Sequence, residues 1–273
     1  MIPNRLATLG HPQRLALFRL LMRRYPDRVP ATELAQALDL KPNTLSTYVN
    51  ALMQAGLVTR ERVGTSLRYA IQMDAAQETI DYLLRDCCRG RPEICAPLAA
   101  PQGAADRKYN VLFLCTGNSA RSIIAESILR HEASDRFVAY SAGTKPRSAL
   151  NPTALEILGQ KGHDVAMLQS KHMSVFQSDE SPDFDFVFTV CNQAANEDCP
   201  AWTGQPVSAH WGLPDPVQVN GTVAEKALAF QSTYAALFNR IKAFTALPIT
   251  SLNRIALQQA VDDIARRNEG ASA

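Results

Sequence analysis

Cys115 and Arg121 are the two residues whose types and spacing most clearly predict chemistry. They bound the segment C-T-G-N-S-A-R, which follows the apolar run Tyr109–Leu114 and precedes a helical pattern that starts near Ser122. A loop between a buried strand and a helix N-terminus directs backbone N–H groups inward, where they bind a tetrahedral oxyanion. The same field is expected to lower the pKa of Cys115 toward or below neutrality, so that its thiolate becomes a nucleophile.

The loop as a whole predicts an oxyanion cradle with a guanidinium at its end. Arg121 matches an oxyanion with two parallel N–H donors, a geometry that lysine lacks. The donors expected around the anion are Thr116, Gly117, Asn118, Ser119, Ala120 and Ser122. The sequence contains no Walker loop, no G-x-G-x-x-G and no H-E-x-x-H that would indicate a competing site.

An acid for the leaving oxygen is predicted far downstream, in H-W-G-L-P-D-P. Asp215 lies there between two prolines, in a stiff loop that can hold its carboxyl over the cradle. The C-x5-R-S loop and the late Asp-Pro together resemble the low-molecular-weight tyrosine phosphatase fold over residues 109–247. The resemblance implies an α/β domain with a doubly wound, parallel four-stranded sheet, which the alternation of strand and helix patterns also favours.

Two further cysteines favour one of the reactions that this fold supports. Phosphatases of the family often carry adjacent tyrosines after the Asp-Pro to grip a phosphotyrosine ring, whereas this chain has Val217-Gln218. The segment F-V-F-T-V-C-N-Q-A-A-N-E-D-C-P instead supplies Cys191 and Cys199, and it resembles the redox segment of the arsenate reductases built on this fold. The resemblance implies that Cys115 forms an adduct with arsenate, that Cys191 expels arsenite, and that thioredoxin or a similar thiol reductant reduces a Cys191–Cys199 disulfide.

Two departures of the chain qualify that resemblance. The eight residues from Cys191 to Cys199 would span about 12 Å as a helix, whereas disulfide-bonded Cα atoms lie roughly 4.4–6.8 Å apart, so the segment must be non-helical or must unwind. Ala120 stands where thioredoxin-coupled relatives often have another cysteine. No cofactor is expected for catalysis, although the resemblance admits a monovalent cation near the anion loop, at Asn118, Glu126 and Ser141.

The first third of the chain predicts a DNA-binding module. Two short helices, Ala31–Leu38 and Pro42–Ala55, are joined by a tight turn in a helix-turn-helix pattern, and a hairpin of Leu57–Val63 and Leu67–Ile71 follows as a wing. The side chains expected to contact bases or phosphates are Asn43, Thr44, Ser46, Thr47 and Asn50 on the second helix and Arg60, Arg62 and Arg68 on the wing. A small helical interaction domain with a solvated basic face is the alternative.

Residues 3–95 resemble the arsenic- and metal-responsive winged-helix repressors of the ArsR type. The likeness rests on L-G-H-P-Q-R-L-A-L-F-R-L-L, the helix-turn-helix, and L-V-T-R-E-R-V-G-T-S-L-R-Y-A-I. It implies a homodimer that binds operator DNA and releases it when a metalloid ligates its cysteines. The familiar cysteine pair before the recognition helix is missing, but Cys87, Cys88 and Cys95 offer three thiolates that suit pyramidal arsenite as the inducer. Zinc, a structural role or plain exposed thiols are the alternatives.

Length and composition indicate two soluble domains. The chain has 273 residues, 46% hydrophobic and 20% charged, with no apolar run near the roughly 18 residues of a membrane span. Residues 1–95 hold 13 Lys and Arg against 9 Asp and Glu, whereas residues 96–273 hold 15 against 17, so the basic part comes first. The N-terminus lacks a secretory signal pattern, so a cytoplasmic location without a membrane partner is expected.

The expected organisation is a winged-helix domain at 1–95, an Ala-, Pro- and Gly-rich linker at 96–108, a reductase- or phosphatase-like domain at 109–250, and a C-terminal surface helix and tail at 251–273. Further helices are predicted at Ala75–Cys87, Ser122–His131, Pro152–Lys161 and Thr222–Thr245, and further strands at Phe137–Ser141 and Phe184–Val190.

The combined interpretation is a bifunctional arsenic resistance protein, in which an arsenite-responsive repressor is fused to a thiol-dependent arsenate reductase. Two alternatives stay open. One is a low-molecular-weight protein tyrosine phosphatase fused to a DNA-binding regulator. The other is a non-catalytic transcription factor that senses an oxyanion.

Overall fold

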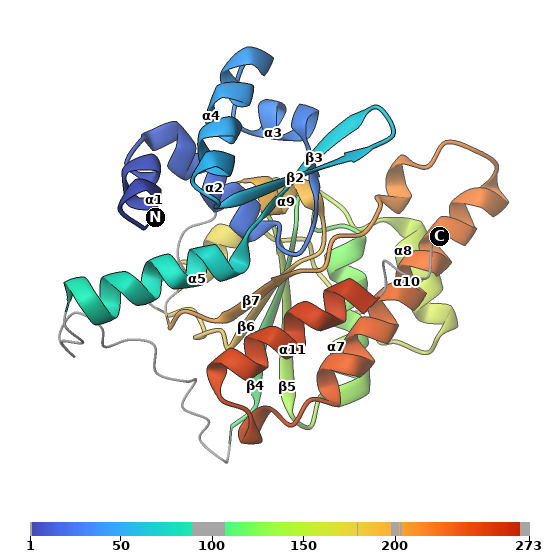
Figure 1. Ribbon diagram of the computed structural model, residues 1–273. Coiled ribbons are helices and arrows are strands. Elements are labelled where there is room, and N and C mark those ends of the chain that lie inside the picture. The colour runs from blue at the N-terminus through green and yellow to red at the C-terminus, as the bar shows by residue number, and fades with distance from the viewer. Residues whose placement is uncertain (1, 89–106, 179, 198–201, 203, 268–273) are drawn as a thin grey trace. The chain divides into compact units, whose positions relative to one another are not determined.

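Among the described residues, three separate sets of buried apolar side chains form the cores, one in the first half of the sequence and two in the second. The structure, a computed structural model, describes residues 2–88, 107–178, 180–197, 202 and 204–267. The chain divides into the units Met1–Ala99 and Ala100–Ala273, and Figure 1 labels most of their helices and strands. The predicted linker, residues 96–108, falls almost entirely outside the described residues.

The first unit has the element order of a winged helix. Its elements are α1 Ile2–Leu9, α2 Pro12–Arg23, β1 Val29–Pro30, α3 Ala31–Ala37, α4 Pro42–Gln54, β2 Val58–Val63, β3 Ser66–Ile71 and α5 Met73–Tyr82, followed by a π-helical turn at Leu83–Cys87. The predicted helices and hairpin are confirmed. The sequence patterns missed α1, which is short and carries a proline, and β1, which has only two residues.

Helix α4 is amphipathic, and its apolar side holds it in the core. Leu45, Val49 and Leu52 recur every three to four residues and are at most 3% exposed. Arg5 of α1 is also buried, and it fastens α1 to the rest of the unit. Its guanidinium donates to the carbonyl oxygens of Ala55 and Ala75 and pairs with a carboxylate of α5.

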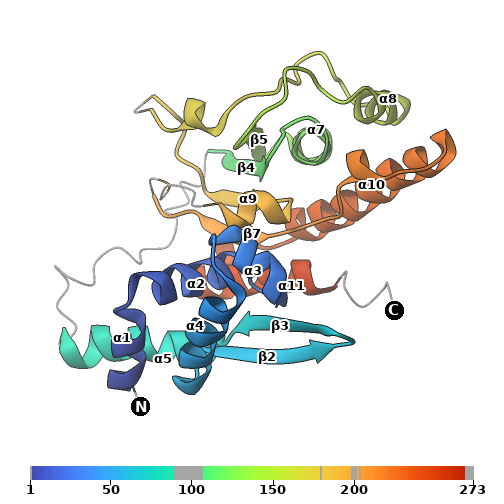
Figure 2. The same ribbon diagram turned by 90° about the horizontal axis from the view of Figure 1, so that it is seen from above.

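The wing is a regular antiparallel hairpin that projects beyond the helices of its own unit (Figure 2). Residues directly opposed in such a pair project on the same face of the hairpin. The register opposes Arg60 to Tyr69, whereas Arg68 is opposed to Glu61. Arg60 and Arg62 therefore lie on one face of the wing and Arg68 lies on the other.

The second unit alternates strands and helices. Its elements are β4 Tyr109–Cys115, α7 Arg121–Ala133, β5 Phe137–Gly143, α8 Pro152–Gln160, β6 Phe186–Thr189, α9 Asn192–Asn196, β7 Val207–His210, α10 Val223–Thr245 and α11 Arg254–Arg267, with 3-10 turns η2 Met173–Phe176, η3 Pro216–Gln218 and η4 Ile249–Ser251. The strands form one sheet in the order β5-β4-β6-β7, and every neighbouring pair is parallel. The predicted four-stranded parallel sheet is confirmed.

Successive residues of β4 face opposite sides of this sheet, as a strand requires. Phe113 belongs to the larger cluster, together with apolar side chains of α7, α8, α10 and α11. Leu114 belongs to a smaller cluster with Met173 and Phe184, so the turn η2 and Phe184 cover that side. Both faces are buried, which explains why β4 is a continuous apolar run.

Helix α11 corrects the prediction of a separate C-terminal surface helix. It packs against β7, and its Leu257, Val261 and Ile264 are at most 5% exposed within the larger core cluster. The helix is therefore an integral layer of the second unit. Among the described residues, no helix has the length and apolar character needed to cross a membrane.

Candidate active site and DNA-binding face

The loop of residues 116–120 is shaped by the segment that follows β5. Backbone N–H groups of residues 145, 147 and 151 donate, each at 2.9 Å, to the carbonyl oxygens of Thr116, Gly117 and Ser119. Because the carbonyl of one residue and the N–H of the next point in opposite directions across a planar peptide, outward carbonyls leave the following N–H groups directed inward. Accordingly, the N–H of Asn118 donates to Cys115 Sγ at 3.0 Å. The loop presents amide donors to an anion.

The Cys115 thiol ends β4 and is only 3% exposed. Burial, with a smaller contribution from nearby Cys191, raises the pKa of this thiol, while the Ser122 hydroxyl, the Asn118 N–H and the Arg121 charge lower it. The net direction is upward, which contradicts the expected fall toward neutrality. Desolvation of the sulfur outweighs the loop's field, and the charge of Arg121 is shared with a carboxylate.

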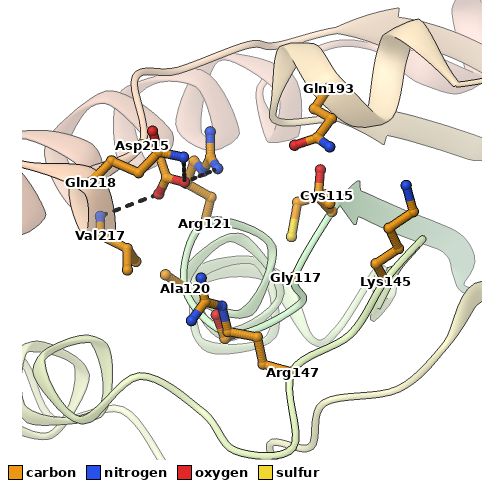
Figure 3. A pocket seen from close by; sticks show the side chains of 12 residues that line it. Cys115, Gly117, Ala120, Arg121, Lys145, Arg147, Gln193, Asp215, Val217 and Gln218 are labelled. Atoms are coloured by element: carbon orange, nitrogen blue, oxygen red, sulfur yellow. Dashed lines mark hydrogen bonds and ion pairs between the residues drawn. The ribbon is translucent and has the colours of Figure 1, made fainter.

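Arg121 ties the anion loop to the distant Asp-Pro segment. It is the first residue of α7, and its Nη1 donates to the carbonyl oxygen of Leu213 at 2.9 Å. Its Nη2 lies 3.0 Å from Oδ2 of Asp215, which also caps η3 by accepting the N–H of Val217 at 3.2 Å. The structure thus brings Cys115, Arg121 and Asp215 to one place (Figure 3).

A cavity of about 160 Å³ lies over Cys115, and seven of the predicted site residues line it. Asn118 and Ser122 do not, because both are fully buried behind the loop. Five lining residues were not among the predicted site residues: Val217 and Gln218, which follow Asp215, and Lys145, Arg147 and Gln193 (Figure 3). The last three follow β5 and β6, the neighbours of β4, and a search at the carboxyl ends of the parallel strands would have found them.

Cys191 lies beside the anion loop. It follows β6 and caps α9, accepting the N–H of Ala194 at 3.4 Å, and its Sγ is 3.4 Å from Thr116 Oγ1. Helix α9 ends at Asn196, so one continuous helix does not reach Cys199. Cys199 itself lies outside the described residues.

A family model decides the classification of this half of the chain. Residues 110–256 match the model of the low molecular weight phosphotyrosine protein phosphatase, which is more than half of the chain and includes Cys115, Arg121 and Asp215. The chain belongs to this phosphatase family. Ahead of the phosphatase-family domain, residues 9–61 match the model of a helix-turn-helix domain, as the order of helices in the first unit predicts.

Several curated relatives of the phosphatase-family domain are arsenate reductases. The arsenate reductase of Shouchella clausii is 37% identical over 137 residues, which cover 50% of this chain and 95% of the relative. The arsenate reductase of Bacillus subtilis is 36% identical over 134 residues, 49% of this chain and 93% of the relative. A solved structure, the arsenate reductase from Archaeoglobus fulgidus, shares 26% identity at a TM-score of 0.40, over 48% of this chain and 95% of that one.

In the helix-turn-helix unit, α4 presents a polar face. Its predicted contact residues Asn43, Ser46, Thr47 and Asn50 are exposed, and Thr44 is half-buried. The hydroxyls of Ser46 and Thr47 donate to backbone carbonyl oxygens of the same helix, at 3.0 and 3.1 Å, so they must rotate to reach DNA. Arg60 and Arg62 of the wing are exposed and Arg68 is half-buried.

The predicted arsenite site is described only in part. Cys87 is exposed at the end of the π-helical turn after α5, Cys88 follows it half-buried, and both are free thiols. Cys95 lies outside the described residues. Within the part of the chain that the structure describes, no three His, Cys, Asp or Glu side chains are grouped to hold a metal ion.

Proposed function

We propose that the phosphatase-family domain reduces arsenate to arsenite and that the helix-turn-helix unit is an arsenite-responsive repressor. The observation that carries the enzymatic part is the second thiol beside the cradle, since Cys191 Sγ lies 3.4 Å from Thr116 Oγ1. A phosphatase of this fold needs only the loop, Arg121 and Asp215. The similarity to curated arsenate reductases supports the same reaction.

In the proposed reaction, loop amides and Arg121 bind arsenate, and the Cys115 thiolate attacks arsenic. A sulfur–arsenic bond forms while one arsenate oxygen leaves as water, protonated by Asp215. Cys191 thiolate then attacks the Cys115 sulfur. The sulfur–arsenic bond breaks with its electron pair left on arsenic, so arsenic(V) departs as arsenite and a Cys115–Cys191 disulfide remains.

The nucleophile is regenerated by a second exchange. Cys199 thiolate attacks Cys191, which frees Cys115 and leaves a Cys191–Cys199 disulfide. A dithiol donor of the thioredoxin type supplies the two electrons that restore the thiols. The end of α9 at Asn196 supports this step, because the helix that Cys191 caps stops before Cys199.

The regulatory part assigns each element of the first unit a role. A homodimer binds operator DNA through α4 and the wing, and arsenite bound by Cys87, Cys88 and Cys95 releases it. The exposed polar side of α4 and the adjacent thiols after α5 support this assignment. Vicinal thiols suit a soft trivalent metalloid, with the third thiolate completing its pyramid.

The enzymatic proposal is tested by assaying one preparation for two reactions. Wild type should form arsenite from arsenate when thioredoxin, its reductase and NADPH are present. Cys115→Ser should abolish both arsenite formation and hydrolysis of p-nitrophenyl phosphate. Cys191→Ser should abolish arsenite turnover only. Arsenite turnover that survives Cys191→Ser would overturn the mechanism, and phosphate-ester hydrolysis without any arsenate reduction by wild type would favour a phosphatase.

A further inference from the structure

Glu126 of α7 is a carboxylate buried behind the anion loop, only 2% exposed. It is not among the residues that line the cavity over Cys115. Its Oε1 accepts a hydrogen bond from Arg130 at 2.5 Å, and its Oε2 accepts one from Ser141 Oγ at 2.5 Å. The ammonium of Lys171 lies 3.8 Å from the same Oε2. A buried carboxylate requires such compensating charge and hydrogen bonds.

A chain of hydrogen bonds runs from this carboxylate to the nucleophile. Ser141 Oγ accepts from Asn118 Nδ2 at 2.8 Å, and the same amide nitrogen donates to Ser122 Oγ at 2.9 Å. Ser122 Oγ in turn lies 2.9 Å from Cys115 Sγ. Asn118 has a left-handed backbone, with φ of 39°, so its fixed side chain maintains an uncommon loop conformation.

Lys171 makes three contacts around the loop, to Asn118 in the loop, to Gly143 of β5 and to Glu126 of α7. Its N–H donates to Asn118 Oδ1 at 2.7 Å, and its carbonyl oxygen accepts the N–H of Gly143 at 2.9 Å. Its ammonium donates to the carbonyl oxygen of Gln169 at 3.2 Å and lies 3.8 Å from Oε2 of Glu126. The N–H of Lys171 fixes the side chain of Asn118, and its charge, together with that of Arg130, balances the buried carboxylate that anchors Ser141.

The oxygens expected to bind a monovalent cation are thus already engaged by the chain itself. Asn118 Oδ1 receives the N–H of Lys171, both oxygens of Glu126 have protein donors, and Ser141 Oγ lies between Asn118 and Glu126. These residues do not fit an additional cation. The positive charge that such an ion would bring is delivered by side chains of the protein.

We infer that Lys171 is an internal counter-ion that replaces an alkali-metal ion behind the anion loop. It is a positioning residue, since it acts on Cys115 through Glu126, Ser141 and Asn118. The anion loop should therefore keep its conformation, and Cys115 its reactivity, in the absence of potassium. Two readouts test this role, the alkylation of Cys115 and the turnover of arsenate, and only the second rests on the proposed function.

The experiment compares wild type, Lys171→Met and Lys171→Arg in potassium chloride and in choline chloride at equal ionic strength. The first readout is the alkylation rate of Cys115 by iodoacetamide, followed by mass spectrometry of its peptide, and it does not depend on the proposed reaction. The second is arsenate turnover, with KM and kcat determined separately. Lys226→Met, which removes an exposed ammonium on α10, is the matched control.

Wild type, Lys171→Arg and the control should give equal rates in the two salts. Lys171→Met should be about tenfold slower in choline, the order of loss seen when a supporting contact is removed, and should recover as potassium enters the vacated position. A saturable response of wild type to potassium would overturn the inference. So would a Lys171→Met protein with unchanged rates, or one equally slow in both salts. If alkylation follows the expected pattern while no variant reduces arsenate, only the proposed function fails.

Discussion

A planar guanidinium, and not only a positive charge, is what Arg121 contributes to the site. Its two terminal nitrogens reach Leu213 and Asp215 in different directions, at 2.9 and 3.0 Å. Lysine carries the same charge but cannot hold both groups and an oxyanion. Arg121→Lys is therefore expected to lower kcat/KM for arsenate by about 10²–10³-fold, the loss typical of one oxyanion donor. A loss no larger than that of the exposed control Arg266→Lys would contradict this role.

The reactivity of Cys115 should depend on pH in a way that Ser122 controls. Only the thiolate is alkylated, so the rate rises as the pH passes through the pKa of Cys115. The Ser122 hydroxyl lowers that pKa against the larger effect of burial. Ser122→Ala should move the rise to higher pH, whereas Ser208→Ala, an exposed serine of β7, should not. A profile that stays in place or moves to lower pH would show that the hydroxyl does not stabilise the thiolate.

At the scale of elements, the end of β5 must pass very close to the anion loop. A Cβ at Gly143 would lie 2.6 Å from the carbonyl oxygen of Thr116 and 3.0 Å from Cβ of Asn118. Gly143→Ala is expected to lower the free energy of unfolding of the second unit by about 1–3 kcal/mol, the usual cost of overpacking, and to reduce arsenate turnover. A Cβ at Gly159 of helix α8 would meet no neighbouring atom, so Gly159→Ala should instead raise the free energy of unfolding by up to about 1 kcal/mol.

Tryptophan fluorescence during urea unfolding measures both variants within the full chain, because Trp202 and Trp211 both belong to the second unit. Equal stabilities of Gly143→Ala and wild type would mean that the strand end and the loop are not as tightly packed as described.

The two faces of the wing are expected to contribute differently to the salt dependence of DNA binding. If the face with Arg60 and Arg62 meets phosphates, Arg62→Ala should lower the slope of log affinity against log salt by about 0.9, the value for one phosphate contact. Arg68→Ala, on the opposite face, should leave that slope unchanged. Fluorescence anisotropy with a duplex selected by the protein from random sequence measures both. An equal fall of that slope for the two variants would indicate that side chains on both faces of the hairpin contact phosphates.

The sequence predicted those parts of the site that lie within one short stretch of the chain. The run from Tyr109 through Arg121 holds a strand, a turn and a helix start in one stretch, so the anion loop could be recognised without tertiary information. Lys145 and Arg147 were missed because they follow β5, and only the strand order places β5 next to β4. Strand β7 was missed because its four residues are too short to give a periodic signal.

The direction of the Cys115 pKa was predicted wrongly for a related reason. A strand followed by a helix N-terminus indicates a field that favours the thiolate, and that field is present as hydrogen bonds to the sulfur. Burial of the sulfur and the pairing of Arg121 with Asp215 come from segments nearly a hundred residues apart. Their balance cannot be obtained from spacing along the chain.

At the scale of the whole molecule, the proposal joins two chemistries in one chain: the product of the phosphatase-family domain is the ligand that releases the helix-turn-helix unit from DNA. Neither unit needs the other for its core, since the buried clusters lie within the separate units. In the proposed scheme the link between them is arsenite, and arsenate alone should act on DNA binding only through catalysis.

The most direct measurement follows the anisotropy of a bound fluorescent duplex after arsenate is added with thioredoxin, its reductase and NADPH. Wild type should release the duplex as arsenite accumulates. Cys115→Ser should stay bound in arsenate yet release the duplex when arsenite is added. Wild type that remains bound while arsenite accumulates, or Cys115→Ser that releases as fast as wild type in arsenate, would contradict the account.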